Sequence, residues 1–202
     1  GETHIPAPVE STKPHMLTRK KDIEQVHMCL AFPGVEQDND ALYPISVMNN
    51  LFGGGMSSRL FQRIREEMGA AYSVYSFPST YTNCGTFTVY AGTSPETAQK
   101  VADELHNQIR LLRDGGVTQE EFDMAKEQLK VSYVLGLESS SSRMSAIGRS
   151  KLLRGRAVDP QDVIRKIEAV TKEGVERAAH EMFSKPFSAS AVGRNVEGLK
   201  LM

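Results

Sequence analysis

A strict alternation of apolar and polar residues after Glu24 constrains the fold of this chain more than any other feature. Apolar side chains occupy every second position, namely Val26, Met28, Leu30 and Phe32, with Gln25, His27, Cys29 and Ala31 between them. Side chains of a β-strand point alternately to opposite faces of a sheet, so this period of two predicts a strand that is buried on one side only.

The segments that follow predict the rest of the fold. Helical spacing of apolar residues alternates with β-rich stretches in the order strand, two helices, hairpin, five helices and strand. This order predicts an α+β fold, with an antiparallel sheet of about four strands and helices packed on one face. The first two helices, the hairpin strands and the last strand are expected at residues 38–51, 58–68, 71–81, 85–93 and 188–192.

Capping signals mark where the later helices begin. Ser94 followed by Pro95 predicts one helix start, and Thr118 with Glu121 forms the pattern of a capping box. Asp159 and Thr171 are two further N-cap candidates. The run Ser139 to Ser142 predicts a polar break between helices, and Gly155 is expected to end the helix that follows it.

Composition and proline content bound the domain organisation and the compartment. Residues 1–20 contain Pro6, Pro8 and Pro14 without strand or helix periodicity, so we expect an extended arm or linker there and one α+β domain over 21–202. No stretch approaches the ~18 apolar residues of a membrane span and no signal-peptide profile is present, so a membrane partner is not expected. The two cysteines, Cys29 and Cys84, favour a reducing, cytoplasmic location over a disulfide scaffold.

Charge and histidine spacing exclude two classes of function. Lys and Arg number 24 against 25 Asp and Glu, a formal net charge of -1, which argues against nucleic acid as a partner. Neither H-E-x-x-H nor H-x-x-E-H occurs, so no two histidines have the spacing of a zinc peptidase helix. We therefore predict no metal site for the five histidines, His4, His15, His27, His106 and His180.

Arg65 and Tyr72 are the residues most suggestive of chemistry. Arg65 lies at the margin of a helix's apolar stripe, and Tyr72 begins the next strand, so both side chains are expected at one edge of the fold. There a guanidinium and a phenol could both donate hydrogen bonds to a carbonyl oxygen. Physical arguments alone favour the other interpretation, an arginine that extends into solvent and a tyrosine that packs with its hydroxyl in water.

The run Gly53-Gly54-Gly55 also has two interpretations. It follows a helix and lacks the Gly-Lys-Ser/Thr of a phosphate loop, so it is either a flexible turn between helices or a place where backbone approaches an extended peptide.

The residues around these positions resemble a known family. Residues 51–61 read LFGGGMSSRLF and residues 65–74 read REEMGAAYSV, which closely resembles the C-terminal half of insulinase/pitrilysin-family zinc metallopeptidases. The resemblance is closest to bacterial processing proteases and mitochondrial processing peptidase, and it extends over residues 20–195.

The resemblance implies two similar α+β halves that close like a clamshell around an extended peptide and have different functions. The N-terminal half of such enzymes carries H-x-x-E-H and Zn²⁺, so this chain is expected to bind no zinc itself and to be inactive alone. Arg65 and Tyr72 match the family's arginine and tyrosine that reach the substrate near the scissile bond, where they would stabilise the polarised carbonyl. Gly53, Gly54 and Gly55 are expected to contact the peptide.

Two functions remain open under this resemblance. The first is the C-terminal domain of a zinc-dependent endopeptidase of the processing type, which needs its zinc-bearing N-terminal half and acts on a peptide or unfolded polypeptide. The second is a non-catalytic partner or core-type subunit that pairs with an active peptidase chain. We favour the first, because the proline-containing arm is what a linker between two halves would look like.

Overall fold

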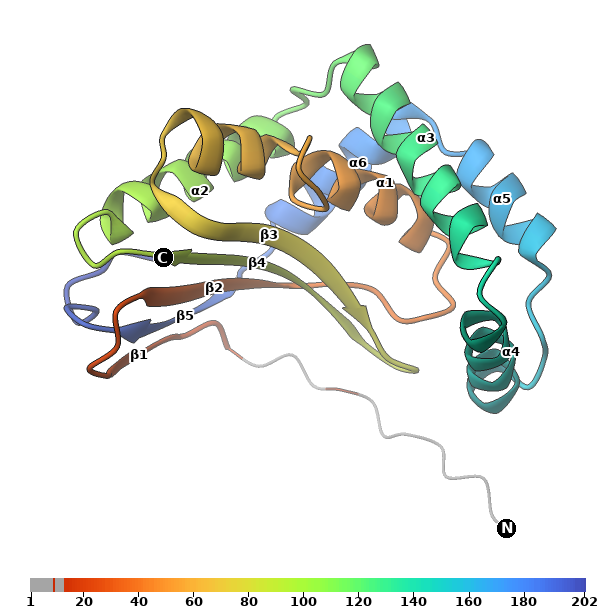
Figure 1. The fold of residues 1–202 in the computed structure, drawn as a ribbon, viewed down its shortest axis with the longest axis horizontal. Helices are drawn as coiled ribbons and strands as arrows, with labels where there is room; N and C mark the ends of the chain where they lie inside the picture. The colour runs from red at the N-terminus through yellow and green to blue at the C-terminus, as the bar shows by residue number, and fades with distance from the viewer. Residues whose placement is uncertain (1–8, 10–12) are drawn as a thin grey trace, which may run out of the picture.

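A computed structural model describes residue 9 and residues 13–202 of the chain. Its centre is a five-stranded sheet in the order β1-β5-β2-β4-β3, with helices on one side of it (Figure 1). This confirms the α+β class and the one-sided helix layer. The strands are β1 (Met16–Lys20), β2 (Val26–Pro33), β3 (Ala71–Thr80), β4 (Gly85–Thr93) and β5 (Ser188–Gly193).

Strand β1 is an additional strand at the edge of the expected sheet. It pairs in parallel with β5, from Met16 opposite Ala189 to Lys20 opposite Gly193, whereas the other strand pairs are antiparallel. The sheet of about four strands is therefore confirmed with five, and residues 16–20 of the expected arm form its edge strand. The five residues of β1 pair with residues about 170 positions later in the chain, so no local pattern in the sequence predicts this strand. The proline-rich residues 1–8 and 10–12 lie outside the described part of the chain.

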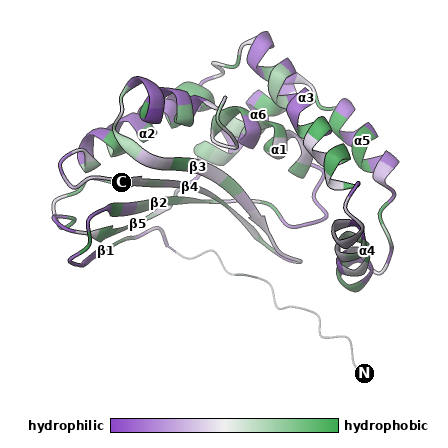
Figure 2. Ribbon diagram, in the orientation of Figure 1, coloured by the Kyte–Doolittle hydropathy of each residue, from purple (hydrophilic) through white to green (hydrophobic). Residues whose placement is uncertain are grey.

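Residues 13–202 contain seven helical segments, of which all except the one at residues 140–154 pack in the second layer. They are α1 (Leu42–Phe52), the π-helix η1 (Phe61–Glu67), α2 (Ala98–Arg113), α3 (Gln119–Gly136), α4 (Ser140–Arg154), α5 (Pro160–Glu168) and α6 (Lys172–Phe183). Figure 2 shows hydrophobic and hydrophilic residues side by side on α2, α3 and α5, as expected for helices that bury one face. No helix among the described residues combines the length and hydropathy needed to cross a membrane.

The core lies between the helices and the sheet. All four alternating apolar residues of β2 are fully or almost fully buried, which confirms the half-buried strand. Phe183 of α6 joins the layers, because its ring centroid lies 5.0 Å from that of Phe32, 5.5 Å from that of Phe52 and 5.8 Å from that of Phe87. Rings from β2, α1 and β4 thus converge on one helix.

Several boundaries differ from the expectation. Helix α2 begins at Ala98 after the N-cap Thr97, because Ser94 and Thr97 close a turn in which the Thr97 amide donates to the Ser94 carbonyl. Three of the four serines expected as a break form the first turn of α4, with Ser139 as its N-cap.

Two other helix boundaries agree with the expectation. The capping box of Thr118 and Glu121 is confirmed, as is the end of α4 at Gly155, whose φ is +70°.

Candidate functional site

The π-helix η1 and the start of β3 hold Arg65 and Tyr72 together. The Arg65 guanidinium carbon lies 4.8 Å from the centroid of the Phe61 ring and 5.7 Å from that of Tyr72. Both aromatic faces attract the cation, an interaction worth about 0.5–1 kcal/mol each at an exposed site. The structure thus brings together the two residues expected to share an edge, and adds Phe61 as a third.

Phe61 and Arg65 lie four residues apart on the π-helical turn. The Met68 amide donates to the Arg63 carbonyl, a step of five residues, and the Ala70 amide donates to the Ile64 carbonyl. With i→i+5 hydrogen bonds the turn is wider than in an α-helix, and such turns are frequent at functional sites. The sequence showed the spacing of Phe61 and Arg65, but a four-residue spacing is also that of an α-helix.

Hydrogen bonds fix the segment that links Arg65 on η1 to Tyr72 on β3. The hydroxyls of Thr93 and Thr97 both donate to the Ala70 carbonyl, which anchors the link from η1 to β3 against β4. The register between β3 and β4 then shifts between Ala71 and Ser73, so Tyr72 is the extra residue of a β-bulge. Bulges redirect side chains at sheet edges, and Tyr72 is 71% exposed.

A shallow hollow adjoins this edge. It is lined by residues of the turns before β2 and β3, of the start of β3 and of the end of β4 with the turn after it, including Gln25, Gly69, Tyr72 and Thr93. Gly69 has φ +57° and nothing near the position of a Cβ, so the chain turns sharply there without crowding the hollow. Tyr72 is open to solvent beside this hollow, and Arg65 is also exposed.

The three glycines of the 53–55 run have different surroundings. A Cβ on Gly53 would lie 2.6 Å from both the amide nitrogen and Oγ of Ser76, and the Ser76 amide donates to the Gly53 carbonyl at 3.0 Å. Gly53 is buried, so its packing against β3 accounts for the glycine. Gly54 is exposed and Gly55 partly exposed, and a Cβ on Gly55 would meet only Nε2 of Gln128, at 3.5 Å.

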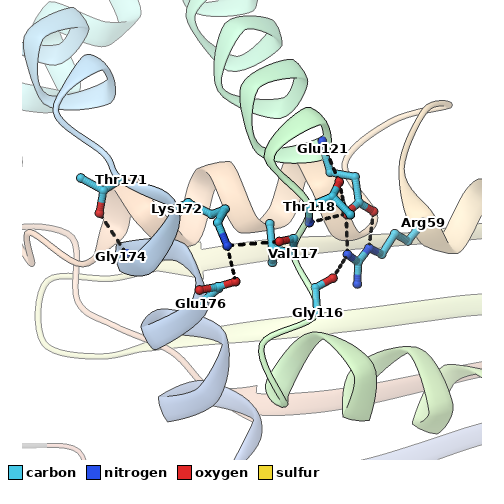
Figure 3. Close-up of polar contacts among 9 residues, drawn as sticks. All are labelled: Arg59, Gly116, Val117, Thr118, Glu121, Thr171, Lys172, Gly174 and Glu176. Atoms are coloured by element: carbon cyan, nitrogen blue, oxygen red, sulfur yellow. Dashed lines mark hydrogen bonds and ion pairs between the residues drawn. The ribbon is translucent and has the colours of Figure 1, made fainter.

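An ion pair anchors the chain just after these glycines. Nε and Nη2 of Arg59 each donate to one carboxylate oxygen of Glu121, both at 2.6 Å, and Arg59 also donates to the Gly116 carbonyl (Figure 3). Lys172 of α6 donates to the neighbouring Val117 carbonyl at 3.3 Å and to Glu176 at 2.8 Å. The sequence did not reveal this cross-link, because Arg59 and Glu121 are 62 positions apart.

Hydrogen bonding controls the protonation of Glu121. Burial alone would raise the pKa of this carboxyl group. Hydrogen bonds from Arg59 and Thr118, together with the positive charge of Arg59, outweigh burial and lower the pKa of Glu121. The carboxylate is therefore ionised at neutral pH and holds both the arginine and the start of α3.

Metal-ligating side chains do not gather in the described part of the chain. No group of three or more His, Cys, Asp or Glu side chains there could hold a metal ion. His27 instead contacts the hydroxyl of Tyr90 through Nδ1 at 2.7 Å, and His180 contacts the Arg113 carbonyl at 3.2 Å. His4 lies outside the described residues. These residues do not fit a zinc site.

A five-stranded sheet with helices on one side defines the class of this chain as a two-layer α+β domain. The family model described as the peptidase M16 inactive domain matches residues 2–129. The chain belongs to this family and corresponds to the non-catalytic C-terminal domain of an M16 protease.

Relatives and solved structures agree with this assignment. An uncharacterised zinc protease of Bacillus subtilis is 40% identical over 176 residues, which is 87% of this chain and 43% of that protein. A second one, of Streptomyces coelicolor, is 38% identical over 170 residues, 84% of this chain and 37% of that protein. The chain thus spans less than half the length of these relatives.

Solved structures show the same fold. A peptidase M16 inactive domain from Pseudomonas fluorescens superposes with a TM-score of 0.84 at 23% identity, covering 96% of this chain and 48% of that one. A protease from Helicobacter pylori also gives 0.84, at 20% identity, covering 95% of this chain and 48% of that one.

Proposed function

We propose that this chain is the substrate-facing domain of a zinc-dependent endopeptidase, with Arg65 and Tyr72 acting on the scissile peptide. The observation that carries the proposal is the stacked, solvent-accessible pair at the bulge of β3. The names of the relatives, which are zinc proteases, support the reaction class.

The roles of the two side chains follow from their donors. Arg65 supplies a permanent positive charge with several N–H donors, and Tyr72 supplies one O–H donor. A carbonyl oxygen becomes more negative as its carbon is attacked, so donors placed around it bind the transition state more tightly than the substrate. The rings of Phe61 and Tyr72 hold the guanidinium in place before substrate arrives, which reduces the cost of reorganisation.

The described residues offer no zinc site, so we propose that the metal is bound by another domain or subunit and that this chain alone is inactive. We also propose that Gly54 and Gly55 approach the backbone of a peptide or unfolded polypeptide, since both are accessible. A cytoplasmic compartment fits the two free cysteines, Cys29 and Cys84.

The decisive experiment substitutes the phenol alone. Tyr72→Phe in the full-length protease keeps the ring over which Arg65 lies but removes one hydroxyl. We expect kcat on a fluorogenic peptide to fall about 10²-fold, the usual effect of losing one transition-state donor. Tyr81→Phe is the matched control, because Tyr81 is also exposed but lies beyond the other end of β3. Unchanged turnover in Tyr72→Phe would leave Tyr72 with a packing role only.

A further inference from the structure

Helix α4 stands apart from the rest of the domain. None of its 15 residues is buried, and α4 takes part in none of the extensive contacts between helices and strands. Figure 1 shows it beyond the end of α3, away from the sheet. An isolated helix of about 15 residues is only marginally stable in water. Helix α4 therefore lacks the packing that stabilises most helices of this length.

The attachments of α4 are confined to its C-terminal end. Arg154 donates to the Gln37 carbonyl at 3.0 Å, and its Nε lies 2.9 Å from the carboxylate of Asp38. The Ser150 hydroxyl donates to the Arg156 carbonyl at 2.8 Å, just past the helix. These contacts position the helix end but cover none of its apolar side chains.

Apolar side chains remain uncovered on α4 and on the last turns of α3. Leu152 is the most exposed of them, at 85%. On α3 the exposed residues are three and four positions apart, which places them on one helix face. We call the set the α3–α4 surface: Val131, Val134, Leu135, Met144, Ile147, Leu152 and Leu153. Exposed apolar residues on two consecutive helices are a candidate interaction site.

The charge of α4 narrows the choice of partner. The helix contains four cationic residues and no acidic residue, although the whole chain has a formal net charge of -1. Arg154 is paired with Asp38, so the charge available to a partner comes from Arg143, Arg149 and Lys151. A matching surface must offer apolar side chains at its centre and carboxylates around them.

We propose that the α3–α4 surface docks onto an acidic, apolar-centred face of the part of the full-length protease that lies outside these 202 residues. This chain covers only 43% and 37% of the two relatives, so more than half of each relative has no counterpart in these 202 residues. A covalently attached domain acts at an effective concentration of about millimolar, so it competes well against free partners. The inference rests on the proposed pairing with a second domain, but not on the roles of Arg65 and Tyr72.

Hydrogen exchange tests this docking without an activity assay. Amide exchange of residues 140–154 would be followed by mass spectrometry in the 202-residue chain and in the full-length protein. We expect exchange to be at least about tenfold slower in the full-length protein, because docking adds the packing that α4 lacks here. Equal exchange in the two proteins would overturn the proposal.

Variants then identify the surface. Leu152→Asp should restore fast exchange of α4 in the full-length protein and weaken binding of the 202-residue chain to the separately produced remainder about tenfold or more. Leu17→Asp is the matched control, since Leu17 is 63% exposed but lies on β1, and it should change binding less than about twofold. Equal effects of the two variants would overturn the choice of surface.

Other outcomes would also overturn the proposal, in distinguishable ways. Binding of the remainder without protection of α4 would place the interface elsewhere and leave the pairing intact, whereas no binding at all would reject the pairing itself. Protection that grows with the concentration of the 202-residue chain alone would indicate a second copy as the occupant. Protection given only by vesicles containing phosphatidylglycerol, and not by the remainder, would indicate a membrane.

Discussion

Arg59 and Glu121 form a two-pronged ion pair that joins the segment after the glycine run to the first turn of α3. The two N–H donors of Arg59 and the two oxygens of Glu121 match one to one, at 2.6 Å each. The same carboxylate accepts a hydrogen bond from the Thr118 amide at 2.9 Å, so it caps a helix and fixes an arginine at once. Both side chains are mostly buried, at 15% and 28% exposure, so solvent screens the pair only in part.

The first prediction concerns the pH dependence of this pair. The pKa of Glu121 is lower in the folded chain than in the unfolded chain, so its ionisation stabilises the fold fully above the unfolded pKa of about 4.3. This stabilisation is lost as pH falls through the lower, folded pKa. Glu121→Gln should therefore lower the free energy of unfolding by about 1–3 kcal/mol at pH 7, and the deficit should shrink below about pH 4. Urea denaturation at both pH values measures it.

The control for that measurement is Glu120→Gln, because Glu120 is exposed in the same helical turn. Its effect should stay within about 0.5 kcal/mol. A deficit for Glu121→Gln that stays constant from pH 7 to pH 3 would show that the effect comes from packing and not from the ionised carboxylate.

The second prediction concerns Gly53. A methyl group there would lie 2.6 Å from the Ser76 amide nitrogen, and this backbone is held in the β3–β4 pair. We expect Gly53→Ala to lower the free energy of unfolding by about 1–3 kcal/mol through overpacking. Gly55→Ala, whose added methyl group meets only the tip of Gln128, should have little effect. Equal effects in a denaturant titration would contradict the packing role of Gly53.

The third prediction concerns the thiol of Cys29. Burial raises its pKa above the usual value, and a hydrogen bond with the Ser190 side chain offsets the shift only in part. Because the thiolate is the reactive form, alkylation of Cys29 by iodoacetamide should be slow at pH 7 and should keep rising beyond pH 9. Peptide mass spectrometry after timed quenching follows it. A rate that levels off below pH 8 would contradict the raised pKa.

Local chemistry in the sequence predicts most of the fold. The alternation in β2, the capping box at Thr118 and the glycine that ends α4 each act within a few residues, so they can be read without a structure. Strand β1 cannot, because its only signal is its pairing with β5 at the far end of the chain. Likewise, Ser94 and Pro95 have the residue types of a helix start, but the Thr97 amide donates to the Ser94 carbonyl and closes a turn, so the helix begins only at Ala98.

The proximity of Arg65 and Tyr72 was predictable from the sequence, but its geometry was not. The seven-residue step from Arg65 to Tyr72 across a helix end predicted that both lie at one edge. In the structure the guanidinium carbon of Arg65 lies 5.7 Å from the centroid of the Tyr72 ring. The π-helical turn and the bulge at Tyr72 come from backbone hydrogen bonding, so neither is visible in residue types. Apolar spacing also predicted helix α4 correctly, but it could not reveal that those side chains are exposed.

The fourth prediction separates the shape of Arg65 from its charge. Arg65→Lys keeps a positive charge but loses the planar group that lies over the Phe61 and Tyr72 rings and can donate two hydrogen bonds to one acceptor. If Arg65 holds a polarised carbonyl, kcat of the full-length protease should fall about tenfold or more. Arg63→Lys is the matched control on the same π-helix, since Arg63 is engaged by Glu67 at 2.7 Å and Glu104 at 3.1 Å. A purely structural role for Arg65 would make the two variants equal in kcat, because each then exchanges one exposed cation for another. A selective loss in Arg65→Lys with unchanged urea midpoint would instead assign the planar guanidinium to the reacting peptide.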